Sequence, residues 1–190
     1  MRRQIAASLG VLALLTVLAG LAYPLLTTAV AQTAFRARAE GSLVRRGGRV
    51  VGSSLLAQPF SSPRYFHPRP SAAGDGYDAT ASGASNLGPT NPKLAAQVAE
   101  RARAYRAENG LAPGTAVPVD AVTTSASGLD PGISVANARL QARRVAAARG
   151  LPVARVLQLV RAHTTGRPFG ILGEEAVDVL DLNLALDAMR

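Results

Sequence analysis

The stretch that decides how this chain is interpreted is Ala57–Pro92, AQPFSSPRYFHPRPSAAGDGYDATASGASNLGPTNP. It holds half of the chain's 12 prolines and half of its Phe and Tyr residues, namely Phe60, Tyr65, Phe66 and Tyr77. A flexible linker is rich in Gly and Ser and poor in rings. Loops longer than about 12–15 residues are uncommon in compact domains unless they are functional. We therefore predict a long ordered loop that packs on its own domain or on a partner.

Length and composition limit the fold and the class of ligand. The 190 residues suffice for one ordinary domain and an additional element. The chain has no Trp and no Cys, so Ala, Val and Leu must build the core, and disulfides and thiolate metal sites are excluded. The net charge of +9 rests on arginines that are dispersed rather than clustered. No zinc-finger, helix-turn-helix or RNP-type pattern accompanies them, so we do not expect a nucleic-acid partner.

The N-terminal segment Ile5–Ala31 carries no charged residue, and about 20 apolar residues suffice to cross a bilayer. A cleaved signal peptide is one interpretation, with Arg2 and Arg3 as its basic region and Ala29-Val30-Ala31 as an A-x-A cleavage site. A retained anchor is the other; a buried soluble helix would be unusual for such a run. We favour the anchor, because the run exceeds the roughly 7–15 apolar residues of a signal peptide.

The orientation of this anchor is open from charge alone. Arg2 and Arg3 precede the span, whereas a larger group follows it: Arg36, Arg38, Arg45, Arg46 and Arg49. A positive-inside count would leave the following domain in the cytoplasm, but the rule weakens for long downstream segments. The expected division is a transmembrane helix over residues 5–31 and a soluble domain over residues 32–190.

Local signals predict the first elements of the soluble domain. Gly47-Gly48 suits a tight hairpin turn between residues 42–44 and Val50–Leu56. Asn91-Pro92 is typical of a helix start, with Asn as N-cap and Pro in the first turn, and Asn109-Gly110 of its end. The segment Ala112–Val122 is predicted to be extended and to contain short strands.

The remaining elements follow a polar loop over residues 123–134. Ser134 is placed to cap a helix over Val135–Arg149, which Gly150 ends. A third helix begins after Pro152 and ends near His163. Val177–Leu186 alternates like a strand in its first half, and its second half fits a strand or a helix. Together these elements predict an α+β fold: one N-terminal transmembrane helix, then a small mixed helix and strand soluble domain with a long ordered loop.

Motifs of common enzyme classes are missing from the sequence. It has no G-x-x-x-x-G-K-[ST] phosphate loop and no G-x-S-x-G or S-x-x-K motif, which disfavours nucleotidases, kinases and serine hydrolases. His67 and His163 lie far apart without a local carboxylate, so no metal site is expected. Two Gly- and Ser-rich loops, residues 82–88 and 124–130, could cradle a phosphate. We favour ordinary turns, since Asp130-Pro131-Gly132 is typical of one.

Taken together, several short motifs in a fixed order carry a resemblance that covers nearly the whole chain. They are Tyr23-Pro24, Gly52-Ser53, Ser62-Pro63-Arg64-Tyr65-Phe66, Arg69-Pro70-Ser71-Ala72, Ser82–Pro89, Asn91-Pro92, Val122-Thr123, Ser127–Pro131, His163-Thr164, Gly166-Arg167 and Leu182-Asn183. In these motifs the chain resembles the C subunit of the Kdp-type potassium-transporting ATPase, a bacterial P-type pump complex.

The resemblance implies a non-catalytic accessory subunit of an ATP-driven potassium importer. Proteins of this family cross the inner membrane once, with a cytoplasmic N-terminus and an extracytoplasmic soluble domain. Their partners are a channel-like potassium-binding subunit and a catalytic P-type subunit. The family's role is to support assembly and, as a catalytic chaperone, to raise the ATP affinity of the catalytic subunit.

Two sets of site residues follow as expectations. We expect the long loop to dock on the potassium-binding subunit, with five candidate partner-binding residues: Tyr65, Phe66, Arg69, Asn86 and Asn91. Rigid rings and prolines would lose little entropy on association. No cofactor is expected; ATP is the one ligand considered, in an alternative in which the chain is a nucleotide-binding regulatory subunit. Its binding residues would be Thr124, Ser125, Ser127, Gly128 and Asp130, although we favour a packing role for that loop.

Overall fold

A computed structural model describes residues 1–189 of the chain. It divides into two compact units, Met1–Leu43 and Val44–Arg190. The long loop belongs to the second unit. The α+β class with a long apolar N-terminal helix is confirmed.

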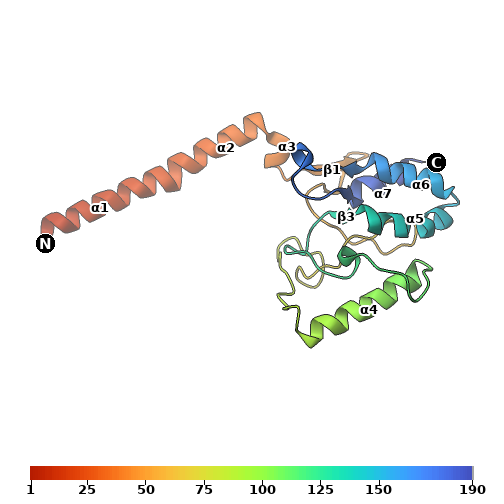
Figure 1. Cartoon of the computed structure of the whole chain (residues 1–190). Coiled ribbons are helices and arrows are strands. Elements are labelled where there is room, and N and C mark those ends of the chain that lie inside the picture. Colours follow the sequence, from red (N-terminus) through yellow and green to blue (C-terminus); the bar gives the residue numbers. More distant parts are fainter. Residues whose placement is uncertain (190) are drawn as a thin grey trace. The chain divides into compact units, whose positions relative to one another are not determined.

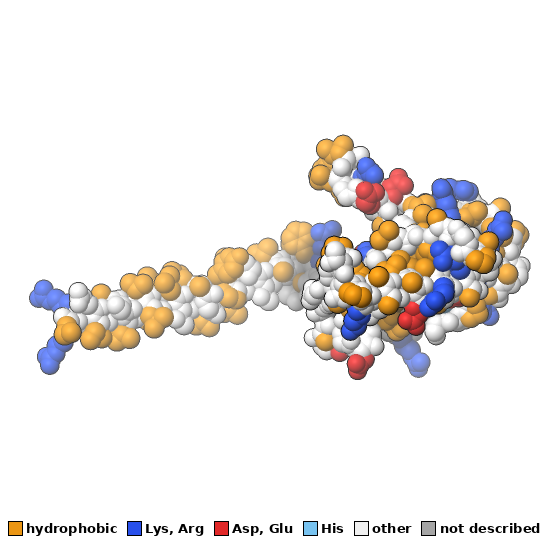
Figure 2. All heavy atoms as spheres, turned by 60° about the horizontal axis from the view of Figure 1, so that its bottom comes forward, with side chains coloured by type: hydrophobic (Ala, Val, Ile, Leu, Met, Phe, Trp, Pro, Cys, Tyr) orange, Lys and Arg blue, Asp and Glu red, His pale blue; other side chains and the backbone are white. Residues whose placement is uncertain are grey.

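The first unit is mainly one apolar helix. α1 (Arg2–Val17), a π-helical turn (Leu18–Ala22) and α2 (Tyr23–Ala34) follow without a break, and α3 (Arg36–Ala39) is a single further turn. The continuous stretch of 33 residues has no buried side chain in its most apolar window, and at 1.5 Å per residue it is about 50 Å long. Figure 2 shows hydrophobic side chains along its whole length and basic residues at its free end. The helix is therefore long and apolar enough to cross a bilayer.

The π-helical turn Leu18–Ala22 has a local cause. Pro24 follows it and lacks the N–H that would bond the carbonyl of Gly20, four residues earlier. A widened turn is a common way for a helix to absorb such a defect without ending.

The second unit begins with the predicted hairpin, β1 (Leu43–Arg46) and β2 (Arg49–Ser53). Gly47 and Gly48 turn the chain with φ of 56° and 77°, which glycine adopts without strain. The long loop follows, and α4 (Pro92–Glu108) begins where Asn91 accepts a hydrogen bond from the Lys93 N–H. The predicted start and end of this helix are confirmed.

A three-stranded antiparallel sheet and three helices form the rest of the second unit. The strand order is β3 (Gly132–Ser134), β5 (Ala176–Asp178), β4 (Thr164–Thr165). The helices are α5 (Val135–Arg149), α6 (Val153–Ala162) and α7 (Val179–Ala188). Figure 1 shows them gathered beside the strands, with α4 set apart from them.

The core of this unit is small and built from short side chains, as the composition predicts. Its buried members are Phe66, Ile133, Ala138, Ala142, Val145, Ala146, Val156, Val160, Val177, Val179, Leu182 and Leu186. Among these described residues, Phe66 is the only aromatic and the only one that comes from the long loop. The loop therefore contributes directly to the core.

Three predictions about the elements need correction or completion. Ala112–Val122 forms no strand; it contains only a short 3-10 helix, Val119–Ala121. The reason is Asp120, whose carboxylate accepts bonds from the backbone and hydroxyl of Ser134 and so draws the segment toward the start of α5. The strands β3 and β4 lie in regions predicted to be loop or helix end. Val177–Leu186 begins in a strand and continues as a helix, because Asp178 caps α7 by accepting from the Asp181 N–H.

Candidate functional site

The candidate site is the place where residues 62–67 of the long loop cross α5 and α7. Two buried amide side chains hold consecutive loop residues there, and we call them the amide clamp: Asn183 on α7 and Gln141 on α5. Asn183 accepts from the Phe66 N–H at 2.8 Å and donates to the Phe66 carbonyl at 2.9 Å. Gln141 makes the equivalent pair of bonds with His67: it accepts from the His67 N–H at 2.8 Å and donates to the His67 carbonyl at 3.0 Å. The clamp thus replaces the strand partner that an extended backbone segment needs when it is buried.

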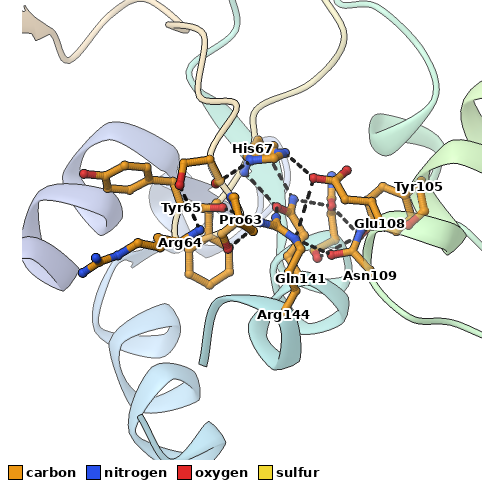
Figure 3. Close-up of polar contacts among 12 residues, drawn as sticks. Pro63, Arg64, Tyr65, His67, Tyr105, Glu108, Asn109, Gln141 and Arg144 are labelled. Atoms are coloured by element: carbon orange, nitrogen blue, oxygen red, sulfur yellow. Dashed lines mark hydrogen bonds and ion pairs between the residues drawn. The ribbon is translucent and has the colours of Figure 1, made fainter. Parts of the chain in front are cut away.

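Two arginines satisfy the carbonyl groups just before the amide clamp. Arg144 donates to the carbonyls of Pro63 and Tyr65, at 2.8 Å and 3.0 Å, and Arg149 donates to that of Arg64 at 2.6 Å. Together with the amide clamp, these side chains bind five consecutive loop carbonyls, from Pro63 to His67. Figure 3 shows Gln141 and Arg144 on α5 facing the loop. Hydrogen bonds from charged donors are stronger than neutral ones. The loop is therefore ordered by side chains of α5 and α7 rather than by a sheet.

The ring of His67 connects the loop to α4. Its Nδ1 lies 2.7 Å from the Glu108 carboxylate, and its Nε2 lies 3.0 Å from the Ser62 carbonyl. The hydrogen bond from His67 is the main reason why the pKa of Glu108 is lower than its ordinary value, and the nearby charge of Arg144 acts in the same direction. The two ring nitrogens of His67 therefore link α4 to the start of the clamped loop segment.

A second buried network joins α4 to α5 next to the amide clamp. The Tyr105 hydroxyl donates to Oδ1 of Asn137 at 2.8 Å, and the Asn137 amide donates to the Asp120 carboxylate at 2.9 Å. Gln141 also donates to Asn137. Burial is the main reason why the pKa of Tyr105 is raised, so its hydroxyl stays protonated and available as a donor.

A cavity of about 250 Å³ lies between the loop, α4 and α5. Its wall includes aromatic and polar side chains, among them Phe60, His67, Tyr77, Arg101, Tyr105 and Glu108. Among residues 1–189, no group of three or more His, Cys, Asp or Glu side chains is placed to hold a metal ion. The polar groups around the cavity bond mainly to one another, an arrangement that stabilises a fold.

The loop with the predicted nucleotide-binding residues packs against the long loop. Asp130 forms an ion pair with Arg69 at 3.0 Å, and the same guanidinium donates to the Thr124 carbonyl. The hydroxyl of Ser125 accepts from the Asp130 N–H, and that of Ser127 accepts from the Leu129 N–H.

The backbone of this loop approaches its neighbour too closely for a side chain at one position. Gly128 has a φ of +69°, and a Cβ there would lie 2.6 Å from the Gly83 carbonyl oxygen and 2.7 Å from the Ala73 nitrogen. The Ser127 carbonyl accepts from the Gly83 N–H at 2.9 Å. The five predicted residues are therefore brought together, and their contacts are those of a packing loop.

The residues predicted to bind a partner lie in different environments. Phe66 is fully buried, so its side chain acts in folding and offers no surface to a partner. Tyr65 donates to Asp187 at 3.0 Å and lies under the guanidinium of Arg149, 5.0 Å from its ring centroid. Arg69 is engaged with Asp130, as described above.

The two asparagines predicted to bind a partner, Asn86 and Asn91, lie outside the core and the ion pairs described above. Asn86 is exposed and adopts a φ of 51°. Asn91 caps α4. These two positions border the same stretch, residues 86–91, just before α4.

The sequence prediction missed the side chains that hold the loop: Asn183, Gln141, Arg144 and Arg149. One local signal was present for Asn183, which is a polar residue within the otherwise apolar segment Leu182–Leu186. A buried amide in such a run needs hydrogen-bond partners. Its partner lies 117 residues away, so no sequence pattern indicates it.

Comparison with known proteins gives a family-level match over almost the entire chain. A family model described as "KdpC: K+-transporting ATPase, c chain" matches residues 5–188. The potassium-transporting ATPase KdpC subunit of Mycobacterium tuberculosis is 57% identical over 189 residues, covering 100% of both chains. That of Caulobacter vibrioides is 58% identical over 176 residues, covering 92% of this chain and 88% of the relative. That of Rhodospirillum rubrum is 55% identical over 189 residues, covering 98% and 96%.

Proposed function

Because this chain belongs to the KdpC family, the c chain of K+-transporting ATPase, we propose that it supports assembly of the potassium importer and raises the ATP affinity of the catalytic subunit. As a KdpC subunit it is a non-catalytic part of the Kdp complex, attached to the membrane by a single N-terminal helix. The observation that best supports the proposal is the fixed long loop, whose backbone is bound by α5 and α7. A surface ordered before binding loses little entropy when it docks.

The proposed partners are the channel-like potassium-binding subunit and the catalytic P-type subunit of the same complex. Within the long loop, Asn86 and residues 88–90 are exposed and Asn91 is half-buried, and we propose this stretch as the docking surface. Tyr65 and Arg69 are engaged within the fold by Asp187 and Asp130. Phe66 is buried in the core and is not part of this surface.

Two conservative variants test this docking surface without disturbing the fold. Asn86→Gly removes the amide but keeps a residue that accepts positive φ. Asn91→Ser removes the amide but keeps an N-cap for α4. We expect the double variant to melt like the parent chain and to co-purify less of the other two subunits, whereas Gln158→Ala, an exposed amide on α6, has no effect. Unchanged recovery with the double variant would rule out this surface.

The effect on ATP is proposed to act through contact with the catalytic subunit. The Leu129 and Asp130 amides bond to hydroxyls of the same loop, and the Gly128 amide bonds to the Ser125 carbonyl. Amides that are already bonded do not cradle a phosphate, so these contacts favour a packing role over a nucleotide site. We therefore propose that this chain raises the ATP affinity of the catalytic subunit without binding ATP itself.

We also propose that the N-terminus is cytoplasmic and the soluble domain extracytoplasmic. Arg2 and Arg3 supply positive charge on the cytoplasmic side of the helix. The arginines after the helix oppose this orientation, but long downstream segments cross regardless of such charges. ATP is hydrolysed in the cytoplasm, so this orientation agrees with an indirect effect on ATP affinity.

Two measurements test the effect on ATP. The first is the ATP concentration for half-maximal hydrolysis by the complex with and without this chain; we expect it to rise when the chain is omitted. The second is calorimetry of the full chain in detergent with ATP at about millimolar concentration, where we expect no heat of binding. Saturable heat that Gly128→Ala abolishes, with the fold retained, would favour the nucleotide-binding alternative.

A further inference from the structure

The connection between β4 and β5 presents apolar side chains to solvent. We call residues 167–174 the apolar tip. Phe169 is 91% exposed, Ile171 79% and Leu172 54%. Single exposed apolar residues are common on soluble domains, but neighbouring ones at the end of a projecting segment usually mark an interaction site. In Figure 1 this connection, in deep blue, extends away from α5 and α6.

The apolar tip is a formed turn. The Gly170 N–H donates to the Arg167 carbonyl at 2.9 Å, and the Leu172 N–H donates to the Pro168 carbonyl at 3.0 Å. Across its base, Arg167 forms an ion pair with Glu174 at 3.1 Å. These contacts fix the apolar side chains at the apex, away from the core.

The backbone of the tip is strained at its most exposed residue. Phe169 has a φ of 55°, a conformation that bulky residues rarely adopt. A glycine would fit there without cost. Strain of this kind persists where the surrounding structure imposes it, and such positions cluster at functional sites. Phe169 is both strained and almost fully exposed, so burial among the described residues does not offset its strain.

We propose that the apolar tip binds in an apolar recess of another subunit of the Kdp complex, an inference that rests on the proposed assembly function. The main alternative occupant is the bilayer surface. The tip and the residue after it carry two carboxylates, Glu174 and Glu175, against one guanidinium, Arg167, although the chain as a whole has a charge of +9. Anionic lipid head groups repel such a local excess of negative charge. A protein recess of matching shape accepts apolar side chains with charged residues at its rim.

The absence of cysteine from the chain provides a direct test. Ile171→Cys introduces the only thiol of this chain at a position of ordinary negative φ. Its rate of reaction with a soluble maleimide is measured in three states: the full chain alone in detergent, the full chain alone in vesicles of phosphatidylglycerol and phosphatidylethanolamine, and the assembled complex in the same vesicles. Val119→Cys, at a position 72% exposed on the 3-10 helix, is the matched control.

We expect the thiol of Ile171→Cys to react rapidly in both states of the isolated chain and about tenfold or more slowly in the complex, as for a residue buried in an interface core. The Val119→Cys control should react at similar rates in all three states. Protection at position 171 in vesicles without the other subunits would assign the tip to the bilayer and overturn the proposal. Equal rates at position 171 in the isolated chain and in a complex that contains all subunits would also overturn it, and would leave the assembly function intact.

A second variant separates docking from folding. Phe169→Gly removes the ring and relieves the positive φ, so the variant should melt no lower than the parent chain. Its recovery of the other subunits should fall about tenfold, because truncating an aromatic anchor is among the costliest changes in an interface. Parental recovery by a folded Phe169→Gly variant would contradict the proposal. If the parent chain itself recovers no partner, the assembly function fails and this inference fails with it.

Discussion

Replacing Asn183 by Ala should destabilise the second unit through the long loop. The change removes both hydrogen bonds to the Phe66 backbone, which are 2.8 Å and 2.9 Å long and fully buried. A buried backbone group left without a partner costs about 1–3 kcal/mol. Two such groups cost about 4 kcal/mol, a large fraction of the roughly 5–15 kcal/mol that stabilises an ordinary domain.

The assay is thermal unfolding of the full chain in detergent, followed by circular dichroism. For a domain of about 150 residues, 1 kcal/mol shifts Tm by about 2–4 °C. The expected fall in Tm is therefore about 8–16 °C. Hydrogen exchange adds a local readout: the amides of Phe66 and His67 should exchange slowly in the parent chain, although they lie outside any helix or strand.

Two further variants make this prediction specific. Asn183→Leu fills the space of the amide without its hydrogen bonds, so it separates the unpaired Phe66 groups from the effect of a cavity. Gln158→Ala, an exposed change on α6, should alter stability by less than about 0.5 kcal/mol. A loss below about 1 kcal/mol in Asn183→Ala would refute the argument, because the Phe66 backbone would then have other partners.

Three other predictions concern pH, packing and topology. The hydrogen bond from His67 lowers the pKa of Glu108. The ionised Glu108 carboxylate therefore stabilises the fold above its ordinary pKa of 4.5, and this stabilisation is lost as the pH falls from 4.5 through the lowered pKa. Glu108→Gln should flatten the pH dependence of Tm in this acidic range. Gly128→Ala should destabilise by about 1 kcal/mol or more, because its Cβ would meet the Gly83 carbonyl and its φ is positive. Ala112→Cys should react with a membrane-impermeant thiol reagent added outside intact cells, since the domain is proposed to be extracytoplasmic and the chain has no other thiol.

Each of these has a control and an opposing result. Glu174→Gln, at an exposed carboxylate, should leave the acid dependence of Tm unchanged; an equal effect of both variants would remove the special role of Glu108. Gly114→Ala meets no atom within 4 Å and should be nearly neutral, and Gly128→Ala with the same stability would disprove the close-packing argument. Labelling of Ala112→Cys only after the cells are opened would reverse the proposed orientation.

The elements that the sequence predicted well are those with local signals. The start of α4 follows from Asn91-Pro92, and the end of α5 follows from Gly150, whose φ is 66°. The hairpin turn at Gly47-Gly48 is equally local. The missed strands β3 and β4 have only three and two residues, too few for an alternating pattern to be recognised.

The arrangement of the candidate site lies beyond such local signals. The order of the long loop was predictable from its rings and prolines, but its cause was not, because Phe66 and Asn183 are 117 residues apart in sequence. Ring content also suggested that Phe66 binds a partner, whereas the fold places it in the core. In a chain with few aromatic residues, an aromatic side chain in a loop can either pack into the core or bind a partner. Only the packing of α5 and α7 distinguishes these two roles for Phe66.

The most direct test of the assembly function is to isolate this chain from membranes that contain the complete Kdp system, through an affinity tag on the chain. We predict that the potassium-binding and catalytic subunits are recovered with it in a constant ratio, and that their potassium-stimulated ATP hydrolysis at low ATP depends on its presence. Recovery of the chain alone, from membranes in which the other two subunits remain assembled and fully active, would contradict it.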